Sequence, residues 1–188
     1  QIETYTNGKQ DEVPLNSAVK NLMGDREHND ELQDRVLGVV VDLVKVPKEY
    51  ETAIEVALGG GIQNIVVEDE DDAKYVINYL KERQYGRLTF LPLTSVKRRD
   101  LPREYSGILR ERGCIGLADQ LVSYDKKYDN VFSNLLGGTL IVDTMDNAVA
   151  IARKYRYSVK IVTLQGDLLS TTGAITGGSR RGNTTKAL

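Results

Sequence analysis

Cysteine and histidine are almost absent from this chain of 188 residues, which has one of each, Cys114 and His28. A single cysteine excludes an internal disulfide framework and fits a reducing cytosol. A zinc site needs about four nitrogen or sulfur ligands, which two residues cannot supply. A Cys–His nucleophile pair is formally possible, but the sequence suggests no third group to orient it. We therefore expect Cys114 to be a small apolar residue at the start of a strand.

Long apolar runs and phosphate-binding motifs are also missing. No run approaches the roughly 20 apolar residues that span a bilayer, and no signal peptide is visible. No G-x-x-x-x-G-K-[ST] loop is present, and no G-x-G-x-x-G opens a helix after a strand. The formal net charge of −2 gives no overall attraction to nucleic acid or membrane. Because the chain opens on Gln1, we expect it to be part of a longer protein.

One stretch of the sequence occurs twice. The first copy begins with a valine-rich segment at 37–44 and the second with the matching segment at 115–122, and each leads into a glycine pair. Up to these glycines the offset is 78 positions, and the matched residues include Gly38 and Gly116, Lys48 and Lys126, Tyr50 and Tyr128, and Leu58 and Leu136. Beyond them the offset is 75, so that Ile65–Glu68 falls on Leu140–Asp143. A self-match with one insertion predicts two copies of one structural unit.

Hydrophobic periodicity assigns elements to these copies. Residues 37–46 form a nearly continuous apolar run, typical of a buried strand, and residues 50–58 have the spacing of an amphipathic helix. The acidic run 68–72 supplies cap oxygens for the helix after it and lacks the ligand spacing of a calcium loop. The remaining expected elements are helices at 17–23 (capped by Asn16 or Ser17) and 73–83, strands at 62–67, 88–92 and 159–164, a turn at 165–167 and a strand pair in the tail.

The pattern predicts an α+β fold with two pseudo-repeated subdomains, each a mixed β-sheet flanked by helices. We expect only modest apolar contact between the copies if each also serves a partner chain. The predicted organisation is an N-terminal flank with short helices (1–36), a first subdomain (37–93), a connector (94–112), a second subdomain (113–179) and a basic C-terminal flank (180–188).

Three features are poorly explained by packing within the chain. Gly173 and Gly177–Gly178 lie in a strand-like tail, where glycine weakens a strand unless another backbone approaches closely. Each copy implies an open sheet edge, which invites pairing with a partner. Basic residues gather at Lys97–Arg99 and at Arg180–Arg181 with Lys186. A charge run is usually a solvated face, so these residues alone do not establish DNA binding.

Six motifs occur in order between residues 37 and 179: Gly38-x-Val40-x-Asp42-Leu43, Lys48-x-Tyr50-x-x-Ala53-Ile54-Glu55-x-Ala57-Leu58-Gly59, Gly86-Arg87-x-Thr89-Phe90-Leu91-Pro92-Leu93, Leu136-Gly137, Ile161-Val162-Thr163-Leu164-x-Gly166-Asp167 and Thr176-Gly177-Gly178-Ser179. No single motif identifies a protein family, but the six motifs in this order do. Jointly they resemble the hinge domain of SMC (structural maintenance of chromosomes) proteins, and among these the bacterial ones most closely.

The resemblance implies a structural and interaction role. In that family the hinge lies at the far end of a long antiparallel coiled coil whose other end carries an ATPase head. Two hinges form a ring-shaped homodimer, in which the first subdomain of one chain meets the second subdomain of the other. For this chain the resemblance implies no catalytic residue, cofactor, metal, membrane contact or small-molecule substrate, and a cytoplasmic, nucleoid-associated location.

The resemblance also implies site residues. Family members use tail glycines to let strands of two chains pack closely, so the implied interface residues are Gly173, Ile175, Gly177 and Gly178. This chain departs from many bacterial members at Thr172, where they have a glycine. Basic residues where hinge and coiled coil meet bind DNA in the family, and the residues in that place here are Arg180, Arg181 and Lys186. Such binding through phosphates would be weak, independent of sequence and dependent on salt.

Two other functions stay open at this point. One is a small-ligand-binding regulatory or enzymatic α/β domain with its site at strand ends near Gly59–Gly61. The missing phosphate loop and acid–base pair argue against it, and stabilisation by a nucleotide would support it. The other is a stand-alone nucleic-acid binder, which would need tight binding at physiological salt.

Overall fold

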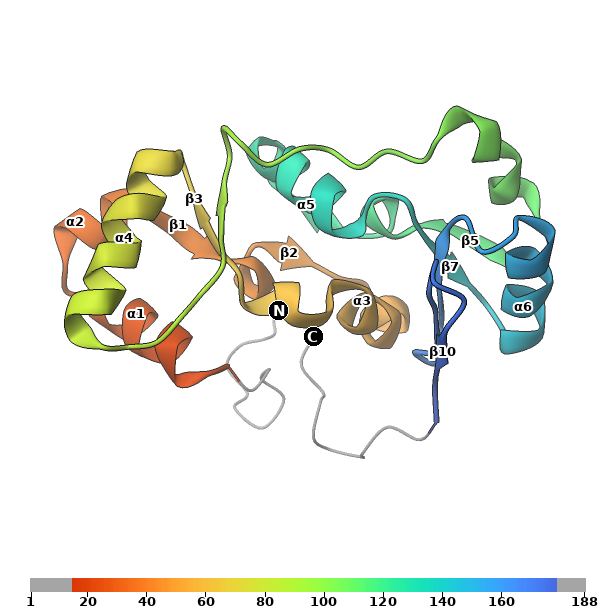
Figure 1. Cartoon of the computed structure of the whole chain (residues 1–188), viewed down its shortest axis with the longest axis horizontal. Coiled ribbons are helices and arrows are strands. Elements are labelled where there is room, and N and C mark those ends of the chain that lie inside the picture. Colours follow the sequence, from red (N-terminus) through yellow and green to blue (C-terminus); the bar gives the residue numbers. More distant parts are fainter. Residues whose placement is uncertain (1–14, 179–188) are drawn as a thin grey trace.

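The computed structural model describes residues 15–178, which form two subdomains side by side along the long axis (Figure 1). The first subdomain is a mixed sheet in the order β1-β3-β4, antiparallel between β1 and β3 and parallel between β3 and β4. Its strands are β1 (Val36–Val39), β3 (Ile65–Val67) and β4 (Phe90–Pro92). The helices packed with it are α1 (Ser17–Arg26), α2 (Asp30–Arg35) and α4 (Glu70–Arg83).

The second subdomain is a five-stranded mixed sheet in the order β10-β9-β8-β7-β5. Only β7 and β8 are parallel, and the other neighbours are antiparallel. Its strands are β5 (Cys114–Leu117), β7 (Thr139–Val142), β8 (Lys160–Thr163), β9 (Leu168–Leu169) and β10 (Ile175–Thr176). Helix α6 (Met145–Lys154) packs on this sheet. Both sheets are mixed and flanked by helices, so the predicted fold class is confirmed.

The two sheets share an irregularity at equivalent positions. In the first, the register shifts between the pairs Val36–Val67 and Gly38–Val66. In the second, it shifts between Cys114–Val142 and Gly116–Ile141. A bulge at the same place in both copies, at the sequence offsets of 78 and 75, confirms the internal duplication.

The middle of the molecule joins the copies more tightly than the sequence predicts. Helices α3 (Glu51–Leu58) and α5 (Asp129–Leu136) pack on each other, and β2 (Val44–Lys45) pairs antiparallel with β6 (Ser123–Tyr124). One apolar cluster runs through both copies and includes Ile54, Val66, Phe132 and Val162. The expectation of modest apolar contact is therefore wrong, because each copy donates its central helix to a shared core.

Residues 37–46 do not form one strand as predicted. The 3-10 turn Val40–Asp42 separates β1 from β2, and it lets β1 join its own sheet while β2 reaches the other copy. An apolar run cannot reveal such a break, since the residues on both sides are buried. The strand expected at 62–67 is also shorter, because a 3-10 helix, Gly59–Gln63, occupies its start.

Helix caps follow the sequence. The Asn16 side chain accepts a hydrogen bond from the backbone N–H of Val19 at 2.9 Å, and Asp69 accepts one from Asp72 at 2.9 Å. The acidic run 68–72 therefore caps α4, as predicted. Negative charge at this end of the helix also complements the helix dipole.

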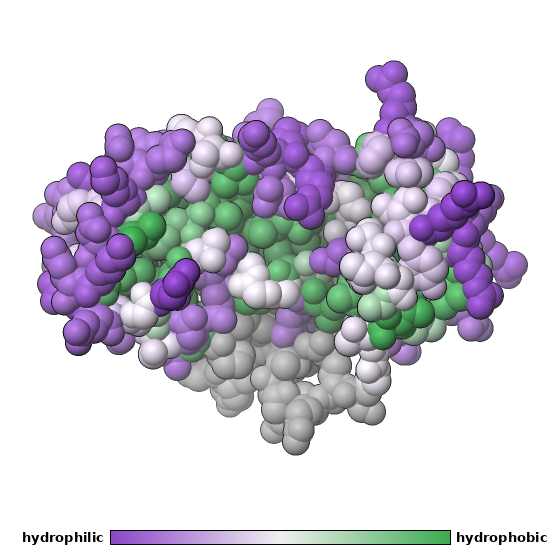
Figure 2. Space-filling model, in the orientation of Figure 1, coloured by the Kyte–Doolittle hydropathy of each residue, from purple (hydrophilic) through white to green (hydrophobic). Residues whose placement is uncertain are grey.

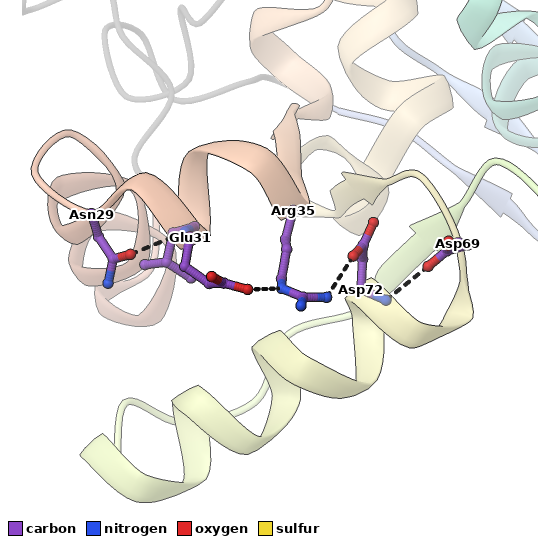
Figure 3. Close-up of polar contacts among 6 residues, drawn as sticks. Asn29, Glu31, Arg35, Asp69 and Asp72 are labelled. Carbon is purple, nitrogen blue, oxygen red and sulfur yellow. Dashed lines mark hydrogen bonds and ion pairs between the residues drawn. The ribbon is translucent and has the colours of Figure 1, made fainter.

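Polar contacts hold helix α2 against α4, as Figure 3 shows. The Arg35 guanidinium donates to Glu31 Oε2 at 2.7 Å and to Asp72 Oδ1 at 2.8 Å, and it lies over the Tyr75 ring at 4.3 Å. The Asn29 side chain caps α2 by accepting from the Leu32 N–H. Because Arg35 and Glu31 keep part of their surface in water, these ion pairs fix the position of α2 more than they stabilise the fold.

Helix α1 is held to α4 by a carboxylate between two tyrosines. Asp25 Oδ2 accepts hydrogen bonds from the hydroxyls of Tyr85 and Tyr79, each at 2.7 Å. These bonds, aided by the nearby Arg83, keep the pKa of Asp25 below its usual value. The side chains of Val19 and Leu22 are fully buried beneath. Both helices of the predicted N-terminal flank therefore pack with the first sheet.

The predicted connector packs against the second subdomain. Its 3-10 segment, Arg103–Arg110, places Ile108 fully buried in the core of that subdomain. The domain boundaries at 36, 93, 112 and 179 stay a prediction. Within residues 15–178, no helix is both long enough and apolar enough to span a membrane.

Candidate interaction site

The four predicted interface residues lie together in and beside the β9–β10 hairpin, at the outer edge of the second sheet. All four residues are exposed, and the Ile175 side chain is the most exposed of the large apolar ones described, at 48%. The hairpin turn is closed by two backbone hydrogen bonds, from Ser170 to Ala174 and from Gly173 to Ser170, both 2.9 Å. The structure thus places an exposed apolar side chain on the last strand of a sheet.

The glycines of this hairpin differ in backbone conformation and in the space around them. Gly173 has φ +91° in the turn, and the neighbouring Thr172 hydroxyl lies 3.0 Å from that of Ser170. A Cβ at Gly177 would lie 2.5 Å from Asp167 Oδ1, so a side chain here would require the Asp167 carboxylate, which accepts a hydrogen bond from Thr163, to move. Gly178 has φ +123° and nothing within 4 Å of where a Cβ would lie. Only Gly178 and Gly173 therefore face open space.

The outer edge of β10 offers unpaired backbone groups. In an antiparallel pair the hydrogen-bonded and non-bonded positions alternate. Since Ser170 bonds to Ala174, the next pair, Leu169 and Ile175, is a non-bonded one. The N–H and C=O of Ile175 therefore point away from β9, toward whatever lies beyond the sheet.

A second edge is β4, which with β1 is one of the two outermost strands of the first sheet. The bonds from Ile65 to Thr89 O and from Leu93 to Val67 O show that alternate residues of this strand face β3. Phe90 consequently directs its N–H and C=O outward. Pro92 has no N–H, which is tolerated at an edge strand. The site residues predicted from the sequence do not include β4, although the proline that ends the 88–92 run is a signal for an edge strand.

Figure 2 shows where the surface around these edges is apolar. Polar side chains dominate the two ends of this face, and apolar side chains gather between them, over the middle of the molecule. Figures 1 and 2 share one orientation, so this apolar surface lies on the side of the molecule on which β10 is visible in Figure 1. Polar ends with an apolar middle are typical of a surface that meets another protein.

The basic residues divide into two groups. Arg180, Arg181 and Lys186 lie outside the described residues. In the other group, Arg98 pairs with Asp129 and Asp100, and the backbone N–H of Arg99 donates to the buried Ser133 hydroxyl at 3.1 Å. Asn134 donates to the Lys97 carbonyl at 2.9 Å. The run Lys97–Arg99 therefore attaches the connector to α5, and Arg98 is neutralised.

The remaining candidates show no arrangement for catalysis. Cys114 begins β5, as predicted, and burial raises the pKa of its thiol, with a further contribution from Glu111. His28 is exposed after α1, in the other subdomain. Gly59–Gly61 follows the C-terminal end of α3, where the helix dipole disfavours an anion. In the described part of the chain, no group of three His, Cys, Asp or Glu residues is placed to hold a metal ion.

Two sheets that share three equivalent strands, joined through central helices, can be compared with known proteins. The family described as SMC proteins Flexible Hinge Domain matches residues 33–152. The chain belongs to the SMC hinge domain family. Among curated relatives of this hinge, the chromosome partition protein Smc of Lactiplantibacillus plantarum is 44% identical over 147 residues. That match covers 78% of this chain and 12% of the relative, so the chain spans a small part of the longer protein.

Solved structures agree with this assignment of the hinge. An asymmetric dimer of the Geobacillus stearothermophilus SMC hinge domain matches with a TM-score of 0.81 and 39% identity, over 92% of this chain and 69% of that one. The Pyrococcus furiosus SMC hinge domain matches with a TM-score of 0.66 and 37% identity, over 88% and 91% of the two chains. The family inferred from the motifs, in its bacterial form, is confirmed.

Proposed function

We propose that this chain is the homodimerisation hinge of a chromosome partition Smc protein. In this proposal, β10 of one copy pairs with β4 of a second copy. The observation that carries it is the mismatch between the two sheets. Strand β8 is covered by the β9–β10 hairpin, whereas the equivalent strand β4 is the last of its sheet. The partner's hairpin would complete the first sheet as the chain's own hairpin completes the second.

Symmetry turns this one contact into a closed assembly. Each copy carries one β4 edge and one β10 edge, on different subdomains. A two-fold axis then makes both contacts at once, first subdomain to second subdomain, and leaves no free edge of this kind to recruit a third copy. The solved structure of the Geobacillus stearothermophilus SMC hinge domain, an asymmetric dimer, supports the association of two hinges.

The proposal extends to the arms and to DNA. Relatives named chromosome partition protein Smc are much longer than this chain, so the hinge would join two coiled-coil arms that lie beyond it. Arg180, Arg181 and Lys186 would add weak, non-specific contact with DNA phosphates, in keeping with a cytoplasmic, nucleoid-associated role. The hinge itself would be non-catalytic.

Sedimentation velocity over a wide concentration range tests the dimer. We expect a dimer that persists at micromolar concentration, and a monomer there would contradict the proposal. Ile175→Lys should shift the chain to monomer because it places a charge in the joint, whereas Leu109→Lys should not, since Leu109 is comparably exposed, at 43%, but lies in the connector. These variants are sharper than substitutions at Gly177, which would disturb the hairpin through Asp167.

Sedimentation velocity in the presence of a short DNA duplex tests the proposed DNA binding. We expect co-sedimentation at about 50 mM salt that is largely lost at about 200 mM, and that Arg180→Ala with Arg181→Ala weakens it at low salt. Binding that is unchanged by both salt and the arginine substitutions would contradict a role for these residues.

A further inference from the structure

A cavity of about 320 Å³ opens between helix α4 and the segment that leads into β4. Its lining residues are Ile77, Leu80, Lys81, Gly86, Arg87 and Leu88. The floor is apolar, because Leu80 is buried and joins the core. The Ile77 residue at the cavity wall is 37% exposed. The cavity therefore has an apolar interior that this chain does not fill.

Four large apolar side chains are exposed in residues 15–178, namely Tyr75, Ile77, Leu109 and Ile175. Tyr75 is accounted for, since the Arg35 guanidinium covers its ring. Leu109 lies in the connector, on the 3-10 segment that contacts β5, at the opposite edge of the second sheet from β10. The other two, Ile77 and Ile175, belong to the two regions that the proposed dimer brings together.

The cavity is continuous with the β4 edge. Leu88, one of its walls, precedes Phe90 by two residues, and α4 packs on β4. A strand added outside β4 would lie about 4.8 Å from it and would turn alternate side chains toward the α4 face of the sheet. Ile175 is central to the β10 edge, because its backbone N–H and C=O are the groups directed outward.

We propose that Ile175 of one copy inserts into this cavity of the second copy, between Ile77 and Leu88. The inference rests on the proposed homodimer and names the contact that anchors it. Insertion would bury the most exposed large apolar side chain described together with Ile77. It would occur twice in each dimer, once at each end.

Two cationic side chains at the cavity make the inserted position selective for an apolar residue. Lys81 and Arg87 line it, and among residues 15–178 no ion pair is recorded for either. A neutral, branched aliphatic side chain can enter between them, but a basic one would meet like charge. The cavity thus favours hairpins with an apolar residue at the position of Ile175.

Cysteine cross-linking in this chain tests the contact directly. In a Cys114→Ala background, Ile77→Cys combined with Ile175→Cys should give a covalent dimer under mild oxidation, because a disulfide needs Cβ atoms about 4 Å apart. The matched control combines Tyr75→Cys with Ile175→Cys. Tyr75 is on the same helix and is equally exposed, at 37%, but residues two apart do not share a helix face.

The outcomes separate the inference from the dimer itself. Cross-linking of the 77–175 pair without the 75–175 pair supports insertion. A dimer in sedimentation velocity that does not cross-link through 77 and 175, or that cross-links equally through 75, overturns the insertion and leaves the dimer standing. A monomer overturns the dimer and the insertion with it.

A double-mutant cycle adds an energetic readout. Ile175→Ala and Ile77→Ala should each weaken dimerisation at least about tenfold, since each removes two apolar contacts per dimer. The double variant should weaken it by less than the product of the two single effects, because both substitutions remove the same contact. Independent effects would contradict the proposed pair.

Discussion

The two subdomains share strand register and bulge position, but only the second subdomain extends its sheet beyond the equivalent strand. In the second, β8 is followed across the sheet by β9 and β10, and in the first, β4 is the last strand. The first copy instead carries α1 and α2, whose side chains enter its core. A duplicated unit has thus become complementary to itself, because one copy has a strand to offer where the other has a place for it.

The loops after the central helices differ as well. Helix α3 ends at Gly59 with φ +54° and continues into a 3-10 turn, where Gly60 has no atom near its would-be Cβ. Helix α5 is followed by Gly137, where a Cβ would clash with the Arg99 carbonyl oxygen. The three extra residues of the first copy are therefore accommodated in an open turn. In the second copy the turn is closed by the connector.

A buried charge is the third difference. Val41 of the first copy and Asp119 of the second occupy equivalent positions, and each is 7% exposed. Within residues 15–178, Asp119 Oδ1 has no hydrogen-bond partner. Burial raises the pKa of this carboxyl above its ordinary value. The second copy therefore keeps a destabilising group where the first has a hydrophobic one.

The largest effect should come from Gly137, which follows helix α5, and Gly60, in the turn after helix α3, is its control. Gly137→Ala should destabilise the fold by about 3 kcal/mol, because its Cβ meets the backbone carbonyls of Arg99 and Ser133, which cannot move aside cheaply. Gly60→Ala should change the free energy of unfolding by less than about 0.5 kcal/mol. Urea denaturation of the two variants checks this, and equal effects would show that the connector does not close the second turn.

An intermediate effect should come from Asp119→Asn. A folded-state pKa above the unfolded one favours the folded state below the unfolded pKa, 3.8, and this contribution is lost as pH rises through the folded pKa. At pH 7 the charge is therefore costly, and Asn should stabilise the chain by about 1 kcal/mol. The gain should shrink when urea denaturation is repeated near pH 4.

Asp129→Asn is the matched control, with the opposite sign. The hydrogen bond from Tyr124, aided by Arg98, lowers the pKa of Asp129, so its contribution is present above the unfolded pKa and is lost as pH falls through the folded-state pKa. Because Asp129 is partly exposed, its loss at pH 7 should be only about 0.5 kcal/mol, and most of it should remain at pH 4. A gain from Asp119→Asn that does not depend on pH would contradict a titrating carboxyl there.

The smallest effects should come from the equivalent helix caps. Asp69 caps α4 and Thr144 caps α6, at distances of 2.9 and 3.2 Å to the backbone nitrogens of Asp72 and Asn147. Alanine at either position should cost about 0.5–1 kcal/mol, and Asp69→Asn or Thr144→Ser should restore most of it. Since the core is shared, both alanine variants should shift one common transition in thermal unfolding. Two separate transitions would contradict a single cooperative core.

Much of the fold could be predicted from the sequence because it depends on local patterns. The helix cap at Asn16, the acidic cap of α4 and the turn at 165–167 follow from residue type alone. The prediction of one strand at 37–46 was wrong for a physical reason. Burial on both sides of a 3-10 turn leaves the same composition as burial in one strand.

The candidate site was only half accessible to sequence reasoning. The tail glycines indicated an exposed strand, and the structure places Ile175 on an outer edge. The sequence could not distinguish Gly177, which makes room for Asp167, from Gly178, which has open space. It also did not single out β4, whose role as an edge depends on which strands lie beside it.

The sequence by itself determined the duplication, the element types and the family, since these reside in repeated residue patterns and local backbone preferences. Only the tertiary structure decided that α3 and α5 merge the copies into one core, that β9 and β10 extend just one of the sheets, and that an unfilled cavity lies beside the other. These features depend on contacts between residues far apart in the chain. The physical reason is that a sheet edge or a cavity is defined by which neighbours are present, and no local pattern specifies them.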